Sequence, residues 1–182
     1  LPGRDVGHVI EVRYDDVIGG AGDLVQGVGQ LEKSGSNPGL PSVAYQVTQQ
    51  QAAVGGAQNT ILVDGGDEMQ GSLLSNLYHG ESTIAAFNAM KYDVATFGNH
   101  EFDWGQSVLN DRTNQASYPF VSANIVKNDT GNCSTANWVV PDQFKVVPYV
   151  VKTLNTTSGT VKVGFIGVST TETPIITIAS AT

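Results

Sequence analysis

The chain has 182 residues, of which 40% are hydrophobic and 14% are charged, and its formal net charge is −8 at pH 7. This hydrophobic content supports a sizeable core and excludes a wholly disordered chain. The negative charge argues against a nucleic-acid polymer or an anionic membrane surface as a partner, and the sequence has no apolar run long enough to cross a membrane.

The first 42 residues form a glycine-rich segment that stands apart in composition from residues 43–182. Loop signals at 19–22 and 34–39 flank residues 23–33, for which a short helix is predicted. We therefore divide the chain into an N-terminal segment, 1–42, and one α/β unit, 43–182.

The α/β unit begins with a predicted helix at 43–54 and a β-branched, aliphatic strand at 60–63 that stops at glycines and Asp67. A helix at 81–91 leads to a strand at 92–97, which ends at Gly98, Asn99 and His100. Parallel strands joined by a crossover helix bring their carboxyl ends to one edge of a sheet, where ligands usually bind. Asp67, Asn99 and His100 should share that edge.

The later part of the chain predicts further sheet structure. Residues 126–141 indicate a surface loop or hairpin, and strands are expected at 144–151 and 161–167 around a polar turn.

The residues after the two strands carry the chemistry of a phosphate-hydrolysing metal site, since they combine carboxylate, amide and imidazole groups. A plain loop at Asp67 and a simple turn at Asn99–His100 are the alternatives. Asp103 could orient His100 or cap a helix that begins near Trp104.

At these residues the sequence resembles the metallophosphoesterase (calcineurin-like) superfamily, and within it the N-terminal catalytic domain of the 5′-nucleotidase and UDP-sugar hydrolase branch. LVDGGDEMQG at 62–71 resembles the family's strand-GD-x-x-QG segment, and YDVATFGNHEFDWG at 92–105 resembles its YD-x-x-x-x-GNHEFD-x-G segment. Weaker similarity at 118–125 and 161–167 extends the resemblance over roughly 43–174. It implies a layered β-sheet core with flanking helices, incomplete relative to the family domain.

By position, the resemblance implies that Asp67 bridges two divalent metal ions and that Asn99 is a ligand of the second. His100 matches the catalytic histidine, and Asp103 matches the acid that orients it. Asn99 and His100 would also meet the substrate. Two metals can activate water and neutralise an in-line phosphoryl transition state, and an imidazolium can protonate the leaving oxygen. A mixed oxygen and nitrogen site accepts zinc, manganese, iron or magnesium.

The family's N-terminal Asp-x-His-Gly run, which holds the first metal, does not occur here. Asp5-Val6-Gly7-His8 is the nearest candidate, with the histidine displaced by one position, which in an extended segment turns the side chain to the opposite face. Asp5 and His8 are candidate ligands, and a flexible terminal stretch is the alternative. The family's later histidine-bearing loops would follow the strand at 161–167. We therefore expect either further polypeptide of the same protein after Thr182 or a chain that has lost the full site.

The resemblance implies a metal-dependent hydrolase of nucleotides or nucleotide sugars, active in nucleotide catabolism. The alternative is a non-catalytic extracellular structural or assembly protein on the same scaffold. The low charge content favours an extracellular, periplasmic or cell-surface location. Three glycosylation tripeptides, at Asn128, Asn132 and Asn155, are in keeping with export, and the single Cys133 allows no internal disulfide.

Overall fold

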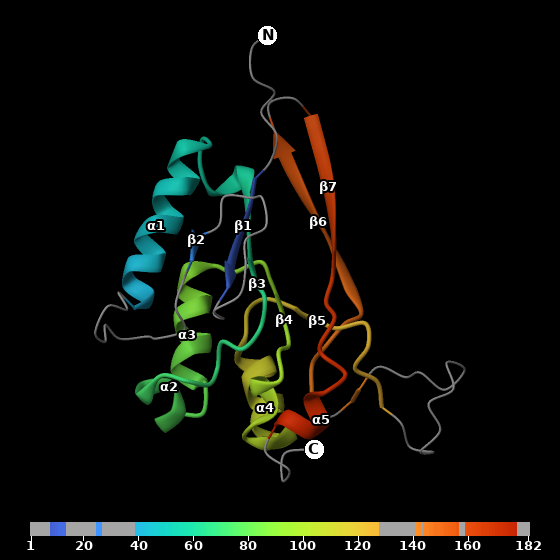
Figure 1. The fold of residues 1–182 in the computed structure, drawn as a ribbon. Coiled ribbons are helices and arrows are strands. Elements are labelled where there is room, and N and C mark those ends of the chain that lie inside the picture. Colours follow the sequence, from blue (N-terminus) through green and yellow to red (C-terminus); the bar gives the residue numbers. More distant parts are fainter. Residues whose placement is uncertain are drawn as a thin grey trace.

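The computed structural model describes residues 8–13, 25–26, 39–127, 141–142, 144–156 and 159–177, with the backbone alone described in the first two ranges. Within these ranges the chain forms a five-stranded sheet of order β2-β1-β3-β4-β5 and a two-stranded sheet, β6-β7 (Figure 1). The strands of the first sheet are β1 His8–Arg13, β2 Val25–Gln26, β3 Thr60–Asp64, β4 Val94–Thr96 and β5 Phe120–Val121, and all of its pairings are parallel. The hairpin strands, β6 Tyr149–Thr156 and β7 Gly159–Ile166, are antiparallel.

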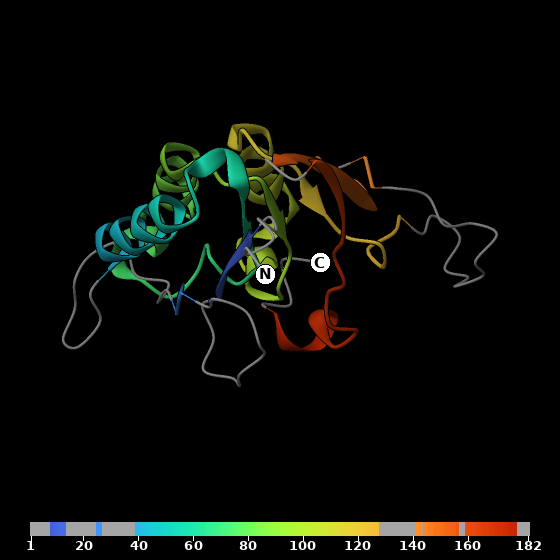
Figure 2. The ribbon, with the colours of Figure 1, turned by 90° about the horizontal axis from the view of Figure 1, so that it is seen from above.

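The helices are α1 Leu40–Ala53, α2 Leu73–Leu77, α3 Glu81–Met90, α4 Gly105–Gln115 and α5 Thr173–Ile176, with 3-10 turns η1 Ala57–Asn59 and η2 His100–Phe102. Three helices, α1, α3 and α4, lie on one face of the five-stranded sheet and the hairpin lies on the other, as Figure 2 shows. None of the helices in the described ranges has the length and apolar character needed to span a bilayer.

The strand β3 is buried on both faces, which explains its continuous apolar sequence. Leu62 packs toward the helices, in a core that also holds Phe87 of α3 and Leu109 of α4. Ile61 and Val63 belong to a second core, which Leu154 of the hairpin closes. The fold is therefore a three-layer arrangement of helices, parallel sheet and antiparallel hairpin, in agreement with the predicted α/β class.

Two predicted elements differ from the observed ones. Val25–Gln26 forms β2 beside β1, so the helix predicted at 23–33 is wrong at these residues. The strand predicted at 144–151 begins only at Tyr149, because Phe144 and Val146 are buried in the helix-side core and Val147 makes only an isolated bridge to Val121.

The N-terminal strands belong to the same sheet as the α/β unit. β1 pairs with β3 from His8↔Thr60 to Val12↔Asp64. Position 42 is therefore not a boundary of the sheet, although the composition changes there. The loop predicted at 126–141 falls mostly outside the described residues.

Candidate functional site

The loops that follow β3 and β4 pass against each other at two glycines. A Cβ on Gly66, whose φ is 93°, would collide with the backbone nitrogen of Gly98. A Cβ on Gly98 would in turn overlap the carboxylate of Asp67. The sequence requires glycine at both positions because the two loops come together at the carboxyl edge of the sheet.

Asp67 lies in this contact with a left-handed backbone, at a φ of 63°. Its N–H donates to Oε2 of Glu101 at 2.8 Å, and its Oδ1 accepts the backbone N–H of His100 at 3.0 Å. Left-handed backbone costs free energy for residues other than glycine and persists where surrounding contacts hold it. The two hydrogen bonds tie Asp67 to the turn that carries Asn99 and His100.

The His100 ring is joined to Asp103 by a hydrogen bond of 2.7 Å between Nδ1 and Oδ2. The His100 side chain is 41% exposed, whereas that of Asp103 is 5% exposed. Partial burial acts to lower the pKa of His100, but the hydrogen bond and charge of Asp103, with the nearby charges of Asp67 and Glu101, raise it above its usual value. Helix α4 begins at Gly105 with Trp104 at its N-cap, so Asp103 does not cap the start of α4.

Glu101 is the principal residue that sequence reasoning missed. Its side chain is buried and accepts three backbone N–H groups, from Gly98 at 2.6 Å, Asp67 at 2.8 Å and Met69 at 3.4 Å. Burial raises its pKa to about 7, and the charge of Asp67 adds to the effect. Glu101 therefore joins the two loops to each other. The signal for Glu101 in the sequence was a carboxylate next to an aromatic residue, Phe102, within the segment at 92–105 that resembles the family.

Two further carboxylates, Asp64 and Glu68, are buried beneath the site. Asp64 accepts the N–H of Gly66 at 2.8 Å through Oδ2. Within the part of the chain that the structure describes, Oδ1 of Asp64 and both oxygens of Glu68 are buried without a hydrogen-bond partner. Burial raises the pKa of Asp64 to about 7 and that of Glu68 well above its usual value, and the neighbouring carboxylates repel one another. Such a pair is stable when it is at least partly protonated.

Asp67 and Asn99 carry side-chain oxygens at this edge that could hold a divalent cation. Within the described ranges, no side chain donates a hydrogen bond to Oδ2 of Asp67, and the side-chain amide of half-buried Asn99 makes no hydrogen bond. The close approach of Gly98 leaves the Asp67 carboxylate against the turn that presents Asn99. Taken alone, the described residues contain no group of three or more His, Cys, Asp and Glu side chains that could hold a metal ion. The residues present therefore fit part of a metal shell.

Of the two N-terminal candidates, His8 is not brought into this arrangement. The backbone of His8 starts β1 and pairs with Thr60, the first residue of β3, whereas Asp67 follows the last residue of that strand. Since parallel strands run in the same direction, His8 begins at the opposite edge of the sheet, and its place in the ligand set receives no support. Asp5 lies outside the described residues.

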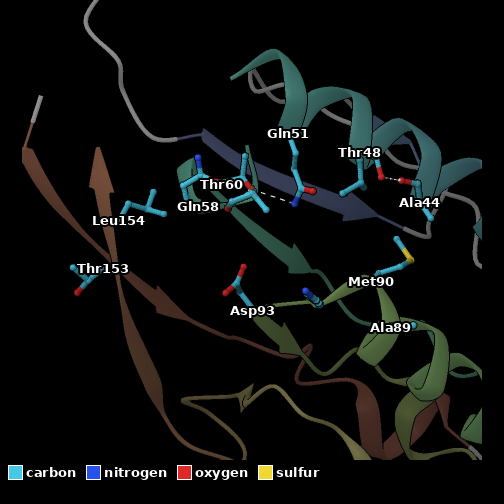
Figure 3. A pocket seen from close by; sticks show the side chains of 13 residues that line it. Ala44, Thr48, Gln51, Gln58, Thr60, Ala89, Met90, Asp93, Thr153 and Leu154 are labelled. Atoms are coloured by element: carbon cyan, nitrogen blue, oxygen red, sulfur yellow. Dashed lines mark hydrogen bonds between the residues drawn. The ribbon is translucent and has the colours of Figure 1, made fainter. Parts of the chain in front are cut away.

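A cavity of about 700 Å³ lies at the amino ends of β3 and β4, away from these residues (Figure 3). It is lined by α1, Thr60, Asp93 and the hairpin residues Thr153 and Leu154. Asp93 already accepts the N–H of Leu62 at 3.0 Å and lies 3.5 Å from Nζ of Lys152. Its carboxylate thus connects the sheet to the hairpin.

Comparison with known proteins gives the following relatives. No family model matches the chain. The snake venom 5′-nucleotidase of Naja atra is 30% identical over 135 residues, which are 74% of this chain and 23% of that protein. The human 5′-nucleotidase is 30% identical over 75% of this chain and 22% of that protein. The 2′,3′-cyclic-nucleotide 2′-phosphodiesterase/3′-nucleotidase of Haemophilus influenzae is 34% identical over 71% of this chain and 20% of that protein. The chain thus spans about a fifth of the length of the curated relatives it matches.

Solved structures agree with these relatives. A 5′-nucleotidase precursor from Thermus thermophilus superposes with a TM-score of 0.57 and 30% identity, over 74% of this chain and 24% of that chain. A calcineurin-like phosphoesterase from Bacillus subtilis gives a TM-score of 0.58 and 29% identity, over 79% of this chain and 43% of that chain.

A parallel sheet whose carboxyl edge presents Asp67, Asn99 and the His100–Asp103 pair, together with these structural neighbours, makes this chain a member of the calcineurin-like metallophosphoesterases, with partial coverage of the family domain. Within that class its relatives are 5′-nucleotidases and related nucleotide phosphoesterases.

Proposed function

We propose that this chain carries out metal-dependent hydrolysis of phosphate esters, as a 5′-nucleotidase-type phosphomonoesterase acting on nucleotides or nucleotide sugars. The observation that carries the proposal is the linkage of Asp67 to the His100–Asp103 pair. The hydrogen bond from the His100 backbone to Asp67 joins the carboxylate that we assign to metal binding to the turn that bears the histidine. The nucleotide hydrolases among its relatives support the substrate class.

Asp67 and Asn99 are the residues we assign to metal binding, with the remaining ligands supplied from outside the described residues. When bound, a pair of divalent ions supplies an activated water and positive charge at the phosphoryl group. Asn99 adds an oxygen donor without adding negative charge, which matters where an anionic phosphate must enter. Asn99 and His100 would also contact the substrate.

His100 is the residue we assign to proton transfer or to charge stabilisation on the phosphoryl oxygens. Asp103 accepts a hydrogen bond, so Nδ1 of the ring carries a proton and Nε2 is left to face the substrate. The raised pKa keeps the ring protonated to higher pH than that of an ordinary histidine. In hydrolysis the P–O ester bond breaks as water attacks, and the departing oxygen takes a proton, which the imidazolium can donate.

Hydrolysis of AMP by the complete native polypeptide tests the proposal, with and without a chelator, alongside His100→Ala. Exposed His79 provides the control, because its ring contacts Trp104 and lies outside the assigned set. We expect activity that requires a divalent metal, falls by roughly 10² to 10⁴ in His100→Ala, and persists in His79→Ala. UDP-glucose and a 2′,3′-cyclic nucleotide, assayed in parallel, would identify the substrate class.

Two outcomes would contradict the proposal. Equal activity in wild type and His100→Ala removes the histidine from the reaction. No activity with zinc, manganese, iron or magnesium favours the alternative, a non-catalytic extracellular structural or assembly protein on this scaffold.

The proposed location is extracellular, periplasmic or at the cell surface. The relatives include a venom protein, which supports export, and the low charge content of 14% is in keeping with it. Fractionation of the source cells with an antibody to the chain tests the proposal, and a signal confined to the cytosol would contradict it.

A further inference from the structure

Thr177 lies 74 residues after Asp103 in sequence, yet its hydroxyl donates a hydrogen bond of 2.8 Å to Oδ1 of Asp103. Thr177 is 8% exposed and occupies the C-cap of α5. We propose that Thr177 is a positioning residue that holds the Asp103 carboxylate, and through it the His100 ring, in the orientation used for phosphoester hydrolysis. This inference rests on the proposed function of the same site.

The two oxygens of Asp103 have different partners on different elements. Oδ2 meets Nδ1 of His100 at 2.7 Å, and Oδ1 accepts from Thr177 at 2.8 Å. In the described part of the chain, nothing else donates to this carboxylate. Rotation of a carboxyl group about χ2 has broad wells, so a single partner would fix the group poorly. Two partners on opposite oxygens define its plane and therefore the direction in which it holds the imidazole.

Thr177 is itself held by contacts that reach back to the parallel sheet. The segment after β7 is tied down at Ser169, whose hydroxyl donates to the Phe97 carbonyl at 2.7 Å and whose N–H donates to Asn124 Oδ1 at 2.9 Å. The N–H of Thr177 then donates to the Thr173 carbonyl at 3.1 Å. Figure 1 shows α5 at the end of the molecule where the loops after β3 and β4 lie. The hydroxyl thus reaches the site from an anchored segment.

A positioning role differs measurably from a purely structural one. If Thr177 serves the proton donor, its loss should be most harmful where the leaving oxygen is strongly basic and needs a proton. The nucleoside alkoxide of AMP is such a group, whereas the p-nitrophenolate of p-nitrophenyl phosphate leaves without one. General loss of structure would lower the two rates together.

The test compares Thr177→Val, which keeps the side-chain shape without the hydroxyl, with Thr177→Ser, which keeps the hydroxyl. Thr173→Val is the matched control, because Thr173 is in the same helix and its hydroxyl donates to the Thr170 carbonyl instead. For Thr177→Val we expect kcat for AMP to fall about tenfold with KM unchanged, since a hydrogen bond to a charged group is worth roughly that factor. The rate with p-nitrophenyl phosphate should fall much less. Thr177→Ser should recover, and Thr173→Val should match wild type.

An NMR measurement makes the inference independent of activity. In ¹⁵N-labelled protein at fixed pH with chelator present, the NMR signal of the His100 Nδ1 proton should shift in Thr177→Val. The signal should return to its wild-type position in Thr177→Ser and should be unchanged in Thr173→Val. An unchanged signal in Thr177→Val, or an equal loss of rate with both substrates, overturns the proposal. If the wild type hydrolyses neither substrate, the proposed function fails and the NMR result alone decides on Thr177. Should Thr177→Val lose its fold by circular dichroism, Thr177→Ala takes its place.

Discussion

Replacing Glu101 with glutamine should change how the stability of the protein depends on pH. The carboxylate accepts N–H groups from Asp67 and Gly98 through Oε2 and from Met69 through Oε1. Glutamine can keep the first two with its carbonyl oxygen, but its NH₂ group would then face the N–H of Met69. Leaving this buried N–H unpaired costs about 1 to 3 kcal/mol, and the 3.4 Å length of the lost bond favours the lower end.

The charge of Glu101 destabilises the wild type at high pH, and the glutamine variant avoids this loss. Burial raises its pKa from 4.5 to about 7, so the folded state binds a proton more tightly than the unfolded state does. The stabilisation from this proton is complete below pH 4.5 and is lost as the pH rises through 7. The two pKa values differ by about 2.5, and each pKa unit corresponds to about 1.4 kcal/mol, so the loss is about 3 kcal/mol at pH 8. Asp64, whose pKa is also about 7, adds a loss of the same sign.

Urea unfolding at pH 5, 6, 7 and 8 measures this effect, in the presence of chelator because a cation at Asp67 would alter the charge balance. Glu101→Gln should be less stable than wild type at pH 5 and should equal or exceed it at pH 8. Glu81→Gln is the control, since the Glu81 side chain is 61% exposed, and it should follow the wild-type curve. Parallel curves for wild type and Glu101→Gln would show that Glu101 does not lose a proton in this range, and would refute the argument.

Three other variants test the geometry of the site. Asp67→Asn removes a charge that repels Glu101 while keeping an acceptor for the His100 N–H. The urea midpoint in chelator should therefore rise, and the AMP hydrolysis rate should fall at least 10²-fold. A lower midpoint would contradict the repulsion. Gly98→Ala places a methyl group against the Asp67 carboxylate and should cost about 1 to 3 kcal/mol in urea unfolding, so wild-type stability would argue against the close contact. In Asp103→Asn the side chain no longer fixes the proton on Nδ1 of His100. We expect kcat for AMP to fall by roughly 10² to 10⁴ while the circular dichroism spectrum is retained. An unchanged kcat would exclude the pair from catalysis.

The elements that flank the site were predictable because their signals are local. The helix expected at 81–91 is observed at Glu81–Met90, and the strand expected at 60–63 is observed at Thr60–Asp64. A right-handed crossover between neighbouring strands has one common arrangement, so the shared edge of Asp67 and His100 followed from the order of the elements. Their hydrogen bond of 3.0 Å agrees with that expectation.

Local sequence patterns did not predict the structure correctly where an apolar segment fits either a strand or a buried loop and packing decides between the two. Residues 144–147 have the apolar character of a strand, but Phe144 and Val146 bury their side chains in the helix-side core, and the hairpin begins later. The direction of β1 relative to the site was equally inaccessible. Asp5 and His8 were candidates because they are the nearest match to the family's Asp-x-His-Gly run, whereas the register with β3 places His8 beside Thr60.

The chemical groups at the ends of β3 and β4 can be predicted from the sequence, because strand ends and glycine turns are encoded within a few neighbouring residues. How those groups are held depends on contacts between distant parts of the chain. Glu101 binds the N–H of Asp67 across 34 residues, and Thr177 binds Asp103 across 74. A hydrogen bond over such a separation depends on how whole layers pack against each other, so the partner of each side chain cannot be read from the local sequence.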